Sequence, residues 1–188
     1  SGLTAGTVYH YAAKSHDSSG DLTTSPDATF TTVAAAPVIP PGCVVSEGGA
    51  WQNVSMSRET GSFTATFSAT PAKADMDGVI GLSDGASAAL TSQAAAVRFN
   101  NTGTIDARNG GAYAAAASIP YVAGTAYSFE LVVNLKKRTY SAYVTGPSGQ
   151  KTIALNYAFR TEQKAATLLN NVAAFADAGS VMVCNVVP

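Results

Sequence analysis

The chain has 188 residues, a formal net charge of −1 and only 12% charged residues. It therefore lacks the basic field that binds nucleic acid or an anionic membrane surface, and its apolar runs fall short of the roughly 20 residues that span a membrane. Ala, Thr, Ser, Gly and Val are frequent whereas Lys and Glu are scarce, which favours an all-β protein that is secreted or displayed at the cell surface.

The first segment, residues 1–33, carries the sequence LTAGTVY at residues 3–9. Its Leu-x-x-Gly-Thr-x-Tyr pattern resembles the tyrosine corner of fibronectin type III domains. The resemblance implies a partial domain, in which residues 28–32 form the closing strand. Because two strands cannot bury an apolar face alone, we expect residues 1–33 to pack against another surface, including self-association with a second copy.

Residues 34–42, AAAPVIPPG, form a Pro/Ala linker. Prolines at this density favour extended chain that acts as a semi-rigid spacer. We therefore place a domain boundary here and assign residues 43–188 to a second domain.

Short segments with a period of two fill residues 43–188 and are separated by turn signals such as Asn109-Gly110. Residues 88–95 fit either a helical turn or a loop. The clearest segment is residues 124–146, which predicts two antiparallel strands joined by a basic turn at 135–138. Many short strands of this kind predict an all-β fold, a two-sheet antiparallel jelly-roll sandwich. The expected strands include residues 63–67, 79–82, 96–99, 104–108, 127–133, 140–144, 151–155 and 181–186.

The order of these strands is distinctive: a VRF strand, an IDAR strand, the hairpin YSFELVVN-turn-YSAYV, and a last strand that carries a cysteine. This order resembles the concanavalin A-like, laminin-G-like family. The resemblance implies the jelly-roll fold. It does not imply one function, because the family includes lectin-like modules, glycosidases, lyases and adhesion domains.

The two cysteines, Cys43 and Cys184, lie near the two ends of the second domain and are too far apart for a CxxC site. We predict a disulfide between the first and last strands, which on the chain-entropy model would stabilise the fold by about 5 kcal/mol. A disulfide would place the protein outside the cytosol. Two buried free thiols are the alternative.

Both histidines, His10 and His16, lie in the first segment, so a serine nucleophile in the second domain would have no histidine to activate it. Glycosidases use two carboxylates held close together, and the pair with a matching spacing, Asp75 and Asp77, lies in a Gly-flanked loop. We therefore expect no catalytic residues.

A structural calcium ion is a further candidate, because concanavalin-like sandwiches hold such ions with carboxylates and carbonyl groups. The candidate ligands are Asp75, Asp77 and Asp84, and the alternative is that they are solvated turn acids.

Glycan binding calls for planar polar groups and exposed aromatic rings, since sugars present CH faces and hydroxyl groups. Trp51 is either a core anchor or a stacking platform, and for the other candidates the alternative is a half-buried aromatic or a solubilising surface charge. The candidate carbohydrate-binding residues are Arg98, Asn100, Arg108, Asn109, Tyr113, Tyr121, Asn134, Tyr143 and Arg160.

Taken together, these patterns predict a non-catalytic carbohydrate-binding accessory domain of a secreted, bacterial, polysaccharide-degrading enzyme, with a polysaccharide or oligosaccharide as its partner. One alternative is a structural or adhesive module of a cell-surface or filament protein. The second is a polysaccharide lyase or hydrolase, which would require a cleft lined by Arg108, Tyr113 and a carboxylate such as Asp106.

Overall fold

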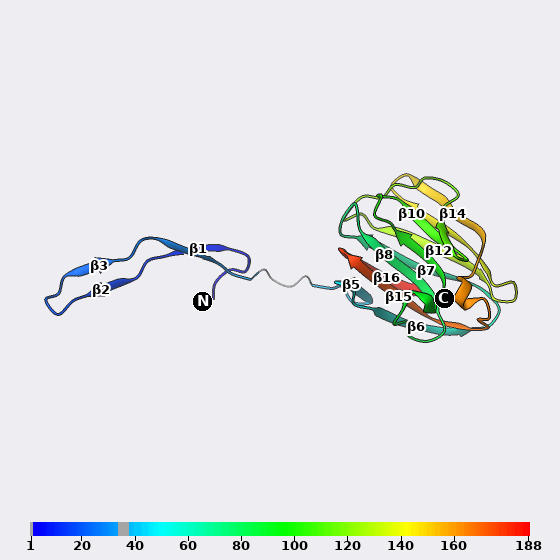
Figure 1. The fold of residues 1–188 in the computed structure, drawn as a ribbon, viewed down its shortest axis with the longest axis horizontal. Coiled ribbons are helices and arrows are strands. Elements are labelled where there is room, and N and C mark those ends of the chain that lie inside the picture. Colours follow the sequence, from blue (N-terminus) through cyan, green and yellow to red (C-terminus); the bar gives the residue numbers. More distant parts are fainter. Residues whose placement is uncertain (1, 34–37) are drawn as a thin grey trace. The chain divides into compact units, whose positions relative to one another are not determined.

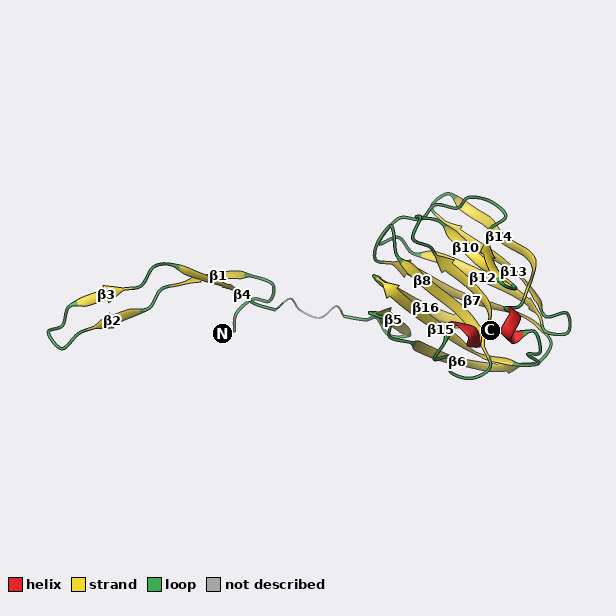
Figure 2. Cartoon of the chain, viewed as in Figure 1, coloured by secondary structure: helices red, strands yellow, loops and turns green. Residues whose placement is uncertain are grey.

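The computed structural model describes residues 2–33 and 38–188 and divides the chain into two units, Ser1–Val38 and Ile39–Pro188 (Figure 1). Strands make up most of the described chain, and two short 3-10 helices, Leu90–Ser92 and Thr161–Gln163, interrupt them (Figure 2). Part of the predicted linker, residues 34–37, lies outside the described residues. Among those that are described, no helix is both long and apolar enough to cross a membrane.

The first unit consists of two antiparallel strand pairs, β1 with β4 and β2 with β3. Their bounds are β1 (Val8–Tyr11), β2 (Lys14–His16), β3 (Leu22–Thr24) and β4 (Ala28–Thr31). The Tyr9 hydroxyl accepts a hydrogen bond from the Thr4 amide at 2.6 Å, and the Tyr9 ring stacks on Phe30. A strand is present where one was expected, as β4, while its role as the closing strand of a fibronectin type III domain and the self-association stay predictions.

The second unit is a sandwich of two six-stranded antiparallel sheets, so the predicted fold class is confirmed. The first sheet runs in the order β11 (Ala112–Ala114), β10 (Ile105–Asn109), β9 (Gln93–Phe99), β8 (Asp77–Ser83), β15 (Leu169–Ala178) and β6 (Gln52–Glu59). The second sheet runs in the order β14 (Gly149–Ala158), β13 (Thr139–Gly146), β12 (Tyr127–Asn134), β7 (Ser62–Pro71), β16 (Ser180–Val187) and β5 (Cys43–Glu47).

The predicted central hairpin is confirmed as β12 and β13, which pair from Ser128 with Thr145 to Asn134 with Thr139. Every second side chain of β12 is buried, as the period of two requires. In the turn, Arg138 adopts a φ of 54°, in the left-handed region. The segment 88–95 divides: its helical turn is confined to Leu90–Ser92, and Gln93 begins strand β9.

Aromatic side chains join the two sheets in the core. Phe99 of β9 meets the ring of Phe129 of β12 edge-on, with ring centroids 5.7 Å apart, and Phe129 stacks on Phe67 of β7. Tyr140 of β13 reaches across to the first sheet, where its hydroxyl lies 2.9 Å from the Ala96 carbonyl oxygen and 2.6 Å from that of Arg108. Burial raises the pKa of Tyr140, so this hydroxyl keeps its one proton and donates it to one of these two carbonyl oxygens at a time.

The predicted disulfide is confirmed between Cys43 and Cys184. These residues face each other in the pairing of β5 with β16, so the bond links the first and last strands of the sandwich. Such a bond is compatible with an extracellular location.

Candidate functional site

The outer face of the first sheet carries a row of side chains that runs across its strands. Alternation along β9 buries Val97 and Phe99 in the core and directs Arg98 outward. The strand register then places outward residues side by side, with Phe175 paired to Val79, Val79 to Arg98, and Arg98 to Asp106. Adjacent strands lie about 4.8 Å apart, so the row from Phe175 to Asp106 spans about 14 Å.

Arg98 and Asp106 form an ion pair on this face that holds both side chains in place. The Arg98 Nε and Nη2 atoms donate to the two Asp106 carboxylate oxygens at 2.9 and 2.7 Å, a bidentate pair. The Asn100 side chain donates a third hydrogen bond to Asp106 at 2.9 Å and accepts one from the Thr104 amide. Asp106 is only 8% exposed, and these three bonds compensate its burial.

Tyr113 of β11 gathers three arginines around one aromatic ring. The guanidinium carbon of Arg98 lies 3.8 Å from the ring centroid and that of Arg108 lies 5.2 Å from it, which are cation–π distances. Arg160 donates to the Tyr113 hydroxyl at 3.3 Å. Burial raises the pKa of Tyr113, although the arginines act in the opposite direction, so the phenol stays protonated at neutral pH.

We call Arg98, Asp106, Arg108, Tyr113 and Arg160 the arginine–tyrosine cluster. Its residues come from β9, β10 and β11, and from the segment that follows β14. The Arg160 amide donates to the Ala94 carbonyl oxygen at 2.8 Å, which anchors that segment beside the start of β9. The cluster therefore depends on the folded sandwich and not on one local motif.

An aromatic pair lies on the other half of the same face. The rings of Trp51 and Phe175 are 4.9 Å apart and inclined by 31°, and both residues are half-buried. Val79 separates Phe175 from Arg98 along the row. Of the two predicted roles for Trp51, the outward position beside Phe175 favours the stacking platform over the core anchor.

The structure brings four predicted carbohydrate-binding residues together in the cluster: Arg98, Arg108, Tyr113 and Arg160. Two others lie beside it with their amides already bonded. The Asn100 side chain is held by Asp106 and by the loop that follows it, and the Asn109 side-chain oxygen accepts from the Ala158 amide at 3.0 Å.

Three predicted carbohydrate-binding residues do not join them. Tyr121 is 5% exposed, and its hydroxyl is bonded to the Asn100 carbonyl and the Met76 amide, so its expected outward position is wrong. Asn134 and Tyr143 belong to β12 and β13 of the second sheet, and Asn134 accepts from the Lys137 amide within the hairpin turn. Asn134 and Tyr143 therefore lie on a different sheet from the arginine–tyrosine cluster, and the sequence does not show which sheet a strand joins.

The candidate calcium ligands do not form one site. Asp77 begins β8 and Asp84 follows its last residue, so about seven residues of extended chain, roughly 23 Å, separate them. Asp77 instead faces Arg98, with 3.9 Å between the nearest charged atoms. Across residues 2–33 and 38–188 no three Asp, Glu, His or Cys side chains group to hold a metal. The expectation that Asp75, Asp77 and Asp84 share a cation is therefore wrong.

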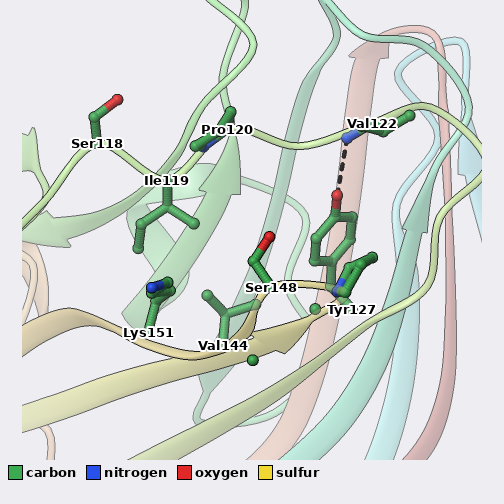
Figure 3. A pocket seen from close by; sticks show the side chains of 11 residues that line it. Ser118, Ile119, Pro120, Val122, Tyr127, Val144, Ser148 and Lys151 are labelled. Carbon is green, nitrogen blue, oxygen red and sulfur yellow. Dashed lines mark hydrogen bonds between the residues drawn. The ribbon is translucent and has the colours of Figure 1, made fainter.

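A hollow of about 420 Å³ lies elsewhere, between the segment 118–122 and the β13–β14 turn (Figure 3). Ile119, Val144 and Tyr127 give it an apolar floor, and the Tyr127 hydroxyl is already bonded to the Val122 amide at 2.9 Å. None of the predicted carbohydrate-binding residues lines this hollow.

Sequence reasoning missed two contributors to the outer face. Phe175 is not among the candidate residues from the sequence, and Asp106 is a candidate there only as a catalytic carboxylate. The spacing by two of Asp106 and Arg108, opposite Arg98 on the preceding strand, was the signal that could have found the ion pair.

Comparison with known proteins supports the fold and gives one related sequence. No family model matches the chain. The chain is 35% identical over 118 residues to a gellan lyase from Bacillus sp, a match that covers 61% of this chain but only 5% of that protein. Among solved structures, a sialidase aligns with a TM-score of 0.52 and 15% identity over 79% of this chain and 16% of its own. The lectin UEA-II, complexed with galactose, aligns with a TM-score of 0.43 and 9% identity over 94% of this chain and 92% of its own.

At 15% identity, the sialidase likeness indicates a shared fold and no more. The chain thus contains a jelly-roll β-sandwich. This fold does not define a function by itself, so function depends on the side chains of its surface.

Proposed function

We propose that residues 43–188 form a non-catalytic carbohydrate-binding module of a secreted, bacterial, polysaccharide-degrading enzyme. The observation that carries this proposal is the outer face of the first sheet, where the Trp51–Phe175 pair and the arginine–tyrosine cluster lie in one row. Aromatic rings stack on the CH faces of sugars, and guanidinium and phenol groups donate hydrogen bonds to their oxygen atoms.

The related gellan lyase sequence gives further support for this proposal. The gellan lyase shares 35% identity with this chain, and the shared part is 5% of its length. The matched segment is thus a small part of that protein, which is compatible with an accessory module. The Cys43–Cys184 disulfide favours a secreted protein.

The side chains at the site favour binding over catalysis. Asp106 already accepts three hydrogen bonds, which leaves it poorly placed as a general base. Tyr113 has a raised pKa, which opposes its use as a base at neutral pH. Both histidines of the chain lie in the first unit.

Trp51 allows a direct test because it is the sole tryptophan of the chain. We expect its fluorescence to change on titration with a polysaccharide that the protein binds. We also expect Trp51→Ala and Tyr113→Ala each to weaken retention in affinity electrophoresis by about tenfold. Loss of a stacked nucleic-acid base costs about 1–3 kcal/mol per aromatic ring, and stacking of a sugar on such a ring has a similar physical origin. Tyr143→Ala, an equally half-buried tyrosine on the second sheet, is the matched control. Unchanged migration of the parent protein across neutral and acidic polysaccharides would refute the proposal.

A polysaccharide lyase or hydrolase is the second candidate, and the gellan lyase match is the observation that favours it. Incubation with the retained polysaccharide, followed by assays for new reducing ends and for unsaturated sugar products, separates the two functions. Product formation that Tyr113→Phe abolishes would establish the enzyme and overturn the non-catalytic role.

A further inference from the structure

The arginine–tyrosine cluster carries more positive charge than its carboxylates neutralise. Arg98 is paired with Asp106 and also faces Asp77. Within residues 2–33 and 38–188, neither Arg108 nor Arg160 forms a salt bridge with a carboxylate. Two guanidinium groups therefore contact Tyr113, one at its ring and one at its hydroxyl, without a counter-ion from the described chain.

The excess positive charge is least favourable at Arg160, because this side chain is buried. It is only 5% exposed, and its Nε atom has no hydrogen-bond partner in the described structure. Its one side-chain hydrogen bond goes to the neutral Tyr113 hydroxyl. A buried cation is unfavourable unless an anion and hydrogen-bond acceptors offset its desolvation. Such an offset could come from a bound anion.

The geometry holds the two unpaired arginines in place. The Arg108 Nε atom donates to the Gly110 carbonyl at 3.0 Å, which fixes the side chain and leaves its terminal nitrogens free to bind. Tyr113 contacts Arg108 through its ring and Arg160 through its hydroxyl. Both arginines therefore contact Tyr113, Arg108 at its ring and Arg160 at its hydroxyl, and planar N–H forks of this kind match an oxyanion.

We propose that the arginine–tyrosine cluster recognises the anionic substituent, a carboxylate or sulfate group, of an acidic polysaccharide. Arg108 and Arg160 bind its oxygens, whereas Arg98, held by Asp106, supports the Tyr113 ring. The inference rests on the proposed carbohydrate-binding function and names its substrate class. Stacking on Trp51 and Phe175 then serves sugar units farther along the same row.

The test compares three polymers in affinity electrophoresis and in titrations of the sole tryptophan: polygalacturonate for carboxylate, dextran sulfate for sulfate, and unsubstituted dextran as the neutral control. Arg108→Gln removes one charge from a half-buried position and should fold normally. Arg58→Gln, an exposed arginine on β6, removes the same charge elsewhere and is the matched control.

We expect the parent protein to bind an acidic polymer and not dextran, and Arg108→Gln to weaken that binding about tenfold to hundredfold, the cost of one charge-assisted hydrogen bond or more. Arg58→Gln should leave it within about twofold, as expected of a charge that makes no contact. Preference for polygalacturonate assigns the carboxylate, and preference for dextran sulfate assigns the sulfate.

Equal losses in the Arg108 and Arg58 variants would mean general charge attraction and would overturn the inference. Binding to dextran that Arg108→Gln leaves intact would also overturn it, while carbohydrate binding itself would stand. Binding to no polymer would overturn both the inference and the proposed function.

Discussion

The two outer faces of the sandwich follow the same alternation but present different chemistry. On the first sheet, Arg98, Asp106 and Tyr113 hold one another in fixed positions through a bidentate ion pair and a cation–π contact. The outward groups of the second sheet include short hydroxyl side chains around a shallow hollow of about 250 Å³. That hollow is lined by Thr66, Phe67, Ser68, Ser128, Phe129, Glu130, Tyr143, Thr145, Gln150 and Asn185.

The difference teaches that the fold and the site are specified by different residues. Inward side chains of both sheets are predominantly apolar, and exchanging them among residues of similar volume would preserve the sandwich. Outward side chains contribute little to the choice of fold, so they can form a fixed polar cluster on one sheet and differ in chemistry on the other.

The largest effect is expected from removal of the disulfide, which joins two strands of the second sheet. Replacing both Cys43 and Cys184 by alanine should lower the free energy of unfolding by about 5 kcal/mol, because the disulfide closes a loop of 141 residues in sequence. Urea unfolding of the variant beside the parent protein measures this loss. At low temperature, where the variant is folded, glycan retention should persist; its disappearance would show that the first face depends on a constraint in the other sheet.

A matched pair of acidic residues sharpens the comparison between the faces. Asp106→Ala should destabilise the protein by about 2–3 kcal/mol. It removes the buried carboxylate that accepts three hydrogen bonds, and it leaves Arg98 without its ion-pair partner. Glu130→Ala on the second sheet should cost about 0.5 kcal/mol or less, as a surface change without such bonds does. Midpoints of urea unfolding give both values. Similar losses would contradict the claim that only the first face is built from fixed side chains.

Two tyrosines of the same strand give a smaller effect and a pH dependence. Tyr140→Phe should cost about 1 kcal/mol, because it removes the hydroxyl that donates to the Ala96 or the Arg108 carbonyl behind the site. Burial raises the pKa of Tyr140 above its ordinary value of about 10, so the folded protein keeps a proton that the unfolded chain releases. The contribution of Tyr140 to the free energy of unfolding is therefore fully present below about pH 10 and is lost as the pH rises above it.

The variant Tyr140→Phe should show a shallower fall in stability above about pH 10 than the parent protein. Tyr143→Phe, which changes the outward tyrosine of β13, is the control and should keep the parent slope. Identical alkaline slopes for all three proteins would show that Tyr140 does not couple the sheets through a protonated hydroxyl.

Much of the fold could be predicted from the sequence because the period of two in β12 and β13 reports directly on burial. The disulfide followed from the positions of Cys43 and Cys184 near the domain ends. The placement of Tyr121 could not be predicted, since half-buried and buried tyrosines share the same local pattern, and its hydroxyl finds partners in Asn100 and Met76 that are distant in sequence.

The site was predictable only in part for a related reason. Arg98, Arg108 and Tyr113 were named from neighbouring strands, and the hairpin signal Asn109-Gly110 placed two of them together. Arg160 comes from a segment that follows β14, and its approach to Tyr113 depends on long-range topology. Asn134 and Tyr143 have equally suitable chemistry, but their strands belong to the other sheet.

The bond between Cys43 and Cys184 also has a mechanical consequence. Tension applied to the two ends of the sandwich enters it through its first and last strands. With β5 and β16 covalently joined, that tension passes from one sulfur atom to the other and bypasses residues 44–183. The strands between the two cysteines are consequently shielded from a force applied between Cys43 and Cys184.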